Sequence, residues 1–243
     1  MWVLFRKEIN NFFSSLLGYV VIFFFLLANG LLIWVFRSPV NVLEGNYSTL
    51  DSLFFISPWA FLFLIPAITM RMFADEKKLG TLELLLSRPI NETTLVLSKF
   101  LASWLLAVLA IIPTLLYFFS VWKLGSPPGN IDIGGTWGSY IGLLLLAGVY
   151  ASIGVFASSL TDNQAVAFVM AVVFILIITW GFNLLATVFN SGSMEFVISK
   201  PGLIHHYESL RRGVVDSRDL VYFFGVILIF IMSTRTVLLS RKW

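Results

Sequence analysis

The sequence predicts an all-α polytopic membrane protein with six transmembrane helices, and its composition is the first reason. Hydrophobic residues make up 58% of the 243 residues and charged residues only 12%, and the mean hydropathy is +0.92. Soluble domains carry about 25% charged residues, and a chain of this length cannot bury so much apolar side chain in one core. We therefore expect most of its surface to face lipid.

The second reason is the presence of six apolar runs near the length of about 20 helical residues that a hydrocarbon core requires. The first five runs contain no Asp, Glu, Lys or Arg, and the sixth contains only Arg235, near its end, where it can reach the head groups. None alternates like a barrel strand, so we expect helices, with a kink at Pro113. The runs form a single domain, 1–243, and span 18–36, 54–70, 100–122, 139–160, 165–189 and 220–239.

The residues before the first run predict an amphipathic helix that lies in the membrane interface. Phe5, Ile9, Phe12, Phe13 and Leu16 recur at spacings of three and four residues. The alternative is an extension of the first span. A cleaved signal peptide is a further alternative, but the apolar run continues beyond the small residues 28–30 to position 36, so we expect the first helix to be retained.

Basic residues in the loops indicate the orientation. Of the 16 Lys and Arg, nine lie on the side of the termini, six lie on the other side, and Arg235 lies within the last span. We therefore expect both termini to be cytoplasmic.

Several classes of function are disfavoured by what the sequence lacks. A net charge of +3 is too small to indicate a nucleic-acid partner. No nucleotide-binding G-x-x-x-x-G-K-[ST], no H-E-x-x-H and no G-x-S-x-G occurs. His205 and His206 are adjacent, which is not metal-ligand spacing. We expect no catalytic residue, no metal and no cofactor.

The spans also lack the ionisable groups that ion-coupled transporters keep within the membrane, so energy should come from a partner. A path with so few polar groups suits an apolar or extended substrate better than a free ion. The alternative is that these groups only form hydrogen bonds between helices. The main polar side chains in or near the spans are Asn29, Thr114, Gln164, Thr179 and Asn183.

The segment 75–89, between the second and third runs, is the most informative. Leu79, Leu82 and Leu86 share one helical face, so a short amphipathic helix is expected there. Gly80 indicates a bend or a close backbone approach, and Pro89 ends the helix. Asn91 is expected to cap the helix that follows. The alternative is an ordinary solvated hairpin.

This segment resembles the signature of ABC-2 type transporter permeases, in which an acidic/basic pair leads into Gly-Thr-x-Glu, a leucine run and a proline. The short turn 158–164 also looks like the second inner loop of that family. Within the family the sequence, from Trp2-Val3-Leu4-Phe5-Arg6-Lys7-Glu8 onward, looks closest to the gliding-motility-associated permease subunits of Bacteroidetes. The residues that match the signature are Glu76-Lys77, Gly80-Thr81-Leu82-Glu83, the leucines at 84–86, and Pro89.

The resemblance implies a permease subunit in the inner membrane, with the helix at 75–89 coupled to a separate ATP-binding subunit. It also implies a second permease copy or paralogue as a dimer partner and an extracytoplasmic auxiliary gliding subunit, in addition to membrane lipid. The alternatives are a membrane anchor that transmits force without moving solute, or a permease for copper-enzyme maturation or drug efflux. The residues implied to couple to the ATPase are Glu76, Lys77, Gly80, Thr81, Glu83, Arg88, Pro89, Asp162 and Asn163.

Overall fold

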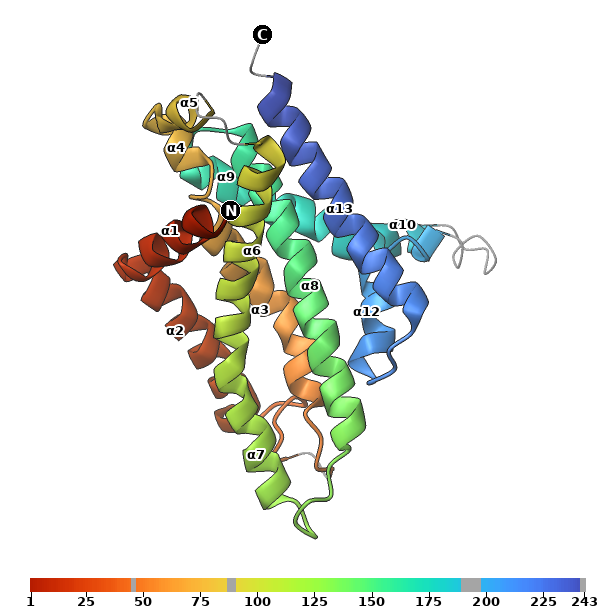
Figure 1. The fold of residues 1–243 in the computed structure, drawn as a ribbon. Helices are drawn as coiled ribbons and strands as arrows, with labels where there is room; N and C mark the ends of the chain where they lie inside the picture. The colour runs from red at the N-terminus through yellow and green to blue at the C-terminus, as the bar shows by residue number, and fades with distance from the viewer. Residues whose placement is uncertain (45–46, 87–90, 189–197, 241–243) are drawn as a thin grey trace.

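Six apolar helical segments, each long enough to cross a bilayer, form the body of the protein in the computed structural model (Figure 1). The structure describes residues 1–44, 47–86, 91–188 and 198–240. Every regular element in these ranges is helical, so the predicted all-α membrane architecture is confirmed. The six segments are Gly18–Val35, Asp51–Lys78, Glu92–Leu124, Ile133–Leu160, Gln164–Thr187 and Ser217–Leu239.

The first segment is preceded by a separate helix, as the amphipathic pattern predicts. Helix α1 (Trp2–Phe13) ends at a turn through Ser14 and Ser15, and α2 (Leu16–Gly30) begins there. The two helices run at a steep angle to each other (Figure 1). The alternative of one continuous helix is therefore wrong. Leu16 departs from the pattern because it starts α2, where it is exposed.

Most spans begin earlier than the apolar runs indicate, because polar caps and first turns precede the apolar residues. Asn91 caps α6 (Glu92–Ile111), as predicted, and its side chain accepts a hydrogen bond from the Thr93 N–H at 3.3 Å. Asp132 and Asn163 cap α8 (Ile133–Leu160) and α9 (Gln164–Leu176) in the same way. The second span, α3 (Asp51–Thr69), begins three residues before the expected position 54.

Two spans contain irregular turns. The kink predicted at Pro113 is present as a 3-10 turn, η2 (Ile112–Thr114), between α6 and α7 (Leu115–Leu124). Two π-helical turns were not predicted: η1 (Leu31–Val35) follows α2, and η3 (Ile177–Gly181) joins α9 to α10 (Phe182–Val188). Residue patterns do not distinguish these turns from α-helix, because both have similar composition.

Helix α8 lies at the centre of the bundle and packs against α3, α6, α9, α12 (Leu203–Arg211) and α13 (Ser217–Leu239). Small residues on α8 allow this close packing. A Cβ atom at Gly154 would lie only 2.1 Å from Thr69 Oγ1 on α3, and one at Gly142 would lie 2.6 Å from Leu210 Cβ on α12.

We expect Gly154→Ala to lower the melting temperature of the detergent-solubilised protein by several degrees. The added methyl overlaps the branched side chain of Thr69, and overpacking of this kind costs about 1–3 kcal/mol. Gly225→Ala on α13 is the matched control, because nothing lies within 4 Å of its Cβ position. Equal melting temperatures for the two variants would contradict the close approach of α3 and α8.

Candidate functional site

The segment that carries the predicted coupling residues lies at the end of the bundle that also holds α1 (Figure 1). It forms two short helices, α4 (Ala74–Lys78) and α5 (Thr81–Leu86), rather than the single helix expected from the leucine pattern. The break falls at Gly80, where φ is +67°. That backbone conformation favours glycine. Nothing lies within 4 Å of its Cβ position, so Gly80 makes a bend and not a close approach.

The bend separates the leucines that were expected to share one face. Leu82 is buried, whereas Leu79 is 73% exposed. Leu86 ends α5. The amphipathic pattern therefore describes α5 alone, and Leu79 belongs to the outer surface.

Helix α4 begins against a serine of the central helix. The Ser158 hydroxyl oxygen accepts hydrogen bonds from the backbone N–H groups of Phe73 at 3.0 Å and Ala74 at 3.1 Å. The same hydroxyl donates to the Met70 carbonyl at 3.0 Å. One side chain of α8 thus satisfies donors at the start of α4 and an acceptor at the end of α3, much as a capping residue does within one helix.

Two further hydrogen bonds join α4 to the turn between α8 and α9. The Lys77 ammonium group donates to the Ser159 carbonyl, and the Gln164 amide donates to the Asp75 carboxylate. The predicted second contact region, 158–164, therefore lies directly beside α4.

The other side of α4 is held by a cluster of four charged side chains. Lys99 Nζ on α6 lies 2.8 Å from Glu8 Oε1 on α1 and 3.0 Å from Glu76 Oε2 on α4. Lys7 Nζ lies 2.9 Å from Glu76 Oε1. We call Lys7, Glu8, Glu76 and Lys99 the ion-pair cluster. Its two positive and two negative charges connect α1, α4 and α6.

Lys99 is the most buried member, with a side chain only 1% exposed. Its ammonium group also donates to the Met72 carbonyl at 2.5 Å and lies 5.0 Å from the centre of the Phe73 ring. A buried ammonium group is tolerated only when it is fully paired and hydrogen-bonded. Removing one member of the cluster would therefore leave an uncompensated charge in the interior.

Lys7 lies at the open edge of the cluster, with a side chain 44% exposed. Burial lowers the pKa of Lys7, but the hydrogen bond to Glu76 and the charges of Glu76 and Glu8 together raise it above its ordinary value. Lys7 therefore remains a cation at neutral pH.

The outer surface of the segment is formed by residues that follow α4. Leu79 and Leu84 are 73% and 67% exposed, and Gly80 and Glu83 are exposed beside them, whereas Leu82 between these pairs is buried. Thr81 is half-buried and donates through Oγ1 to the Glu76 carbonyl at 3.3 Å. The segment thus has an inner side bound to the bundle and an outer side open to a partner.

The predicted site residues therefore fall into groups. Glu76 and Lys77 face the bundle, whereas Gly80 and Glu83 face outward. Asp162 is exposed, and Asn163 caps α9 by accepting a hydrogen bond from the Ala165 N–H at 2.9 Å. Arg88 and Pro89 lie outside the described residues.

Sequence reasoning missed Glu8, Lys99 and Ser158. Lys99 gave a usable signal, because it is the only charged residue between Glu92 and Lys123. A lone lysine near the end of a long apolar helix indicates a charged partner. Ser158 gave no such signal, since serines are frequent along α8.

The polar side chains within the spans form hydrogen bonds inside the bundle. Thr114 Oγ1 donates to the Ile111 carbonyl at 2.6 Å, and Thr179 Oγ1 donates to the Tyr150 hydroxyl at 3.0 Å. Asn29 is fully buried and donates to the Phe25 carbonyl at 2.8 Å. The Thr179 bond joins η3 to α8, as the alternative of hydrogen bonds between helices requires, whereas these bonds of Thr114 and Asn29 lie within one span.

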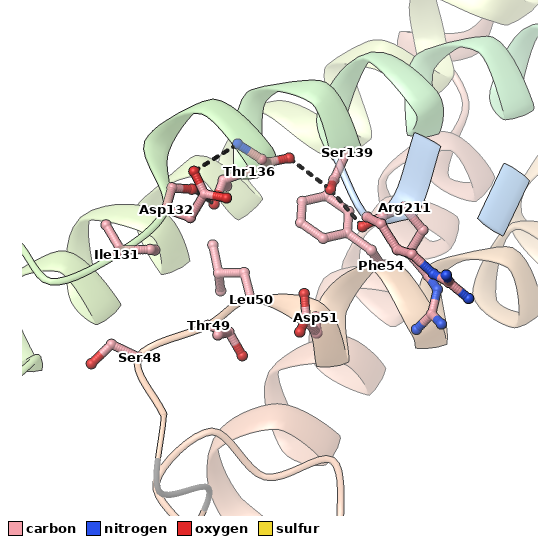
Figure 2. Close-up of a pocket in the computed structure, with 12 residues that line it drawn as sticks. Ser48, Thr49, Leu50, Asp51, Phe54, Ile131, Asp132, Thr136, Ser139 and Arg211 are labelled. Carbon is pink, nitrogen blue, oxygen red and sulfur yellow. Dashed lines mark hydrogen bonds between the residues drawn. The ribbon is translucent and has the colours of Figure 1, made fainter. Parts of the chain in front are cut away.

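A pocket of about 300 Å³ opens at the opposite end of the bundle, between the starts of α3 and α8 and the end of α12 (Figure 2). Asp132 accepts a hydrogen bond from the Gly135 N–H at 2.9 Å, and Ser139 donates to the Arg211 carbonyl at 2.8 Å. Arg211 also lies 5.7 Å from the Phe55 ring. These polar groups stabilise helix ends around the pocket.

The six spans and the anchored segment define a multi-pass helical membrane protein with an outward-facing element between its second and third spans. Residues 38–204, more than half of the chain, match the family model described as ABC-2 family transporter protein. The chain belongs to this family and is a membrane permease subunit of an ABC transporter. A search of curated proteins found no match.

We expect Lys99→Met to destabilise the protein by about 3–5 kcal/mol, the range observed when one partner of a buried ion pair is removed. Glu8 and Glu76 would be left as buried carboxylates without their shared cation. Thermal unfolding in detergent measures the loss, and Lys78→Met, at an exposed position of α4, is the control. A melting temperature equal to that of the control variant would show that the cluster does not hold α4.

Proposed function

We propose that the outer side of α4–α5 is the surface on which a separate ATP-binding subunit acts on this permease. The supporting observation is the division of the segment into an anchored inner side and an exposed outer side. Leu79 and Leu84 expose apolar surface beside the charge of Glu83. Exposed apolar residues next to charge are typical of protein–protein contacts.

The hydrogen bonds and ion pairs of α4 explain how a displacement of this surface is transmitted to the spans. Ser158 and Lys77 bind α4 to the end of α8, and Glu76 binds it to α1 and α6. Movement of α4 is therefore passed to three other helices at once. In this proposal Gly80 and Glu83 contact the ATPase, and Arg88 and Pro89, which lie outside the described residues, are included from the sequence resemblance alone. Glu76, Lys77 and Thr81 transmit the movement.

Asp162 and Asn163 supply a second, smaller contact. They lie in the exposed turn between α8 and α9, and α4 packs against both of these helices. An ATPase seated on α5 is thus close to this turn as well. The absence of any nucleotide-binding motif supports a separate subunit as the site of ATP hydrolysis.

We place this end of the protein in the cytoplasm and the spans in the inner membrane. The excess of basic loop residues on this side supports that orientation. A second permease copy or paralogue is proposed to pack against α2 and α9. Only 22% of the residues in the apolar windows of their spans are buried, against 78% for the span formed by α8; the last span, Ser217–Leu239, is buried to the same 22% and is a further candidate face.

The proposed process is gliding motility, with an extracytoplasmic auxiliary gliding subunit on the opposite side. Its support is the sequence resemblance alone. Copper-enzyme maturation and drug efflux are the alternative export tasks, and a force-transmitting anchor is the alternative class. Purified permease–ATPase complex in vesicles separates these classes: substrate movement favours a transporter, whereas ATP hydrolysis without movement favours an anchor.

We expect Glu83→Lys and Gly80→Ala each to reduce permease-stimulated ATP hydrolysis at least about fivefold. The first reverses the charge of the contact surface, and the second places a side chain at a positive φ, which costs about 1–2 kcal/mol and reorients α5. ATPase activity of the reconstituted complex is the measurement.

Glu44→Lys is the control for charge reversal, because Glu44 is exposed at the opposite end of the bundle. Membrane insertion should be normal in all three variants. Unchanged ATPase stimulation in both the Glu83 and Gly80 variants would remove α5 as the coupling surface.

The orientation is tested by reporters of topology. A reporter that is active only in the cytoplasm should be active when it is fused after Trp243. The same reporter inserted at Gly129 should be inactive, because that loop is expected to be external. The reverse pattern would invert the proposed topology and place α4–α5 outside the reach of a cytoplasmic ATPase.

A further inference from the structure

A pocket of about 390 Å³ lies beside the ion-pair cluster, between α1, the end of α3 and the α4–α5 segment. Its polar lining includes Asn11 on α1, Ser14 in the turn after it, Arg71 just after α3, and Asp75 on α4. Arg71 directly follows Met70, the residue that ends the membrane-spanning helix α3. The amphipathic helix α1 forms the opposite wall, so the pocket lies at the depth of lipid head groups.

Arg71 has unused hydrogen-bonding capacity in this pocket. One terminal nitrogen donates to Ser15 Oγ at 3.2 Å. The Nε atom is covered by protein and has no hydrogen-bond partner among the described residues, so a ligand reaches it only when the side chain shifts toward the pocket. No described carboxylate pairs with this guanidinium within 4 Å. Buried donors are normally satisfied, and the fork geometry of arginine suits a phosphate group.

Among the described charged residues that line the pocket, one cation and one anion have no oppositely charged partner within 4 Å. Lys7 and Lys99 balance Glu8 and Glu76 within the ion-pair cluster. Arg71 and Asp75 remain. The Asp75 carboxylate accepts a hydrogen bond from the side-chain amide of Gln164, which is neutral and does not balance the negative charge. A ligand that carries both a phosphate and a cation would match these two groups.

We propose that this pocket binds the head group of phosphatidylethanolamine from the adjoining leaflet. The phosphate lies against Arg71, with the side-chain amide of Asn11 as a further donor, and the ammonium group lies against Asp75. A primary ammonium group donates up to three hydrogen bonds to carboxylates, which the quaternary nitrogen of phosphatidylcholine cannot do. Phosphatidylglycerol has no cation, so it would place its phosphate near an unpaired Asp75.

The choice of ethanolamine over choline also follows from the lining. Quaternary ammonium groups are recognised by cages of several aromatic rings. Phe12 is the one aromatic residue that lines this pocket within the described part of the chain. The bound lipid would join α1 and α4 to the membrane surface, whether or not the protein transports a solute.

Native mass spectrometry of the purified full chain, incubated with equal amounts of the three lipids, tests this proposal. We expect the wild type to retain phosphatidylethanolamine at least about fivefold more than either other lipid. Arg71→Gln should reduce that retention about tenfold, through loss of a charged, two-point phosphate contact. Arg37→Gln, at an exposed arginine on the opposite side of the bundle, should retain the lipid as the wild type does.

Two further variants keep the test informative if Arg71→Gln folds poorly. Arg71→Lys retains the charge but loses the fork, so retention should fall to an intermediate level. Asp75→Asn preserves the position of the Gln164 contact and should abolish the preference for phosphatidylethanolamine over phosphatidylglycerol.

Equal retention of all three lipids by the wild type, or unchanged retention in the Arg71 variants, would overturn the proposal. Displacement of the lipid by millimolar inorganic phosphate would instead indicate a free-anion site and overturn it as well.

Discussion

The structure of the α1-bearing end of this protein depends on one buried ammonium group. Lys99 extends from a membrane-spanning helix into a space between two carboxylates from different elements, and its position is set by both. Because neither carboxylate can leave without exposing an unpaired charge, α1 and α4 have a defined place against α6.

This constraint makes the N-terminal helix part of the same packed unit as α4 and α6. Glu8 contributes one of the two carboxylates, and Lys7 neutralises the second oxygen of the other. The family match covers residues 38–204 and so leaves α1 and α2 outside it. The physical unit at this end of the bundle is therefore larger than the matched region and includes the first turns of the chain.

The sequence was sufficient for the features that depend on local chemistry. The lipid-facing composition, the separate α1, the cap at Asn91 and the kink at Pro113 all follow from properties of neighbouring residues. The bend at Gly80 was predicted only as one of two alternatives, since a glycine pattern does not reveal what surrounds it. The ion pairs and the Ser158 contacts to α4 were not predicted, because they join residues 23 to 91 positions apart, from Lys99–Glu76 to Lys99–Glu8. Such pairings depend on how the helices pack, which no local pattern contains.

Gly80 also affects how the sequence of this segment can vary among related permeases. Residues before it are held by the bundle, so substitutions there must satisfy partners on α1, α6 and α8. After it, Glu83 and Leu84 are exposed whereas Leu82 is buried, and one glycine separates the two short helices. The surface offered to a partner can therefore diverge between related permeases while the membrane-embedded body stays the same.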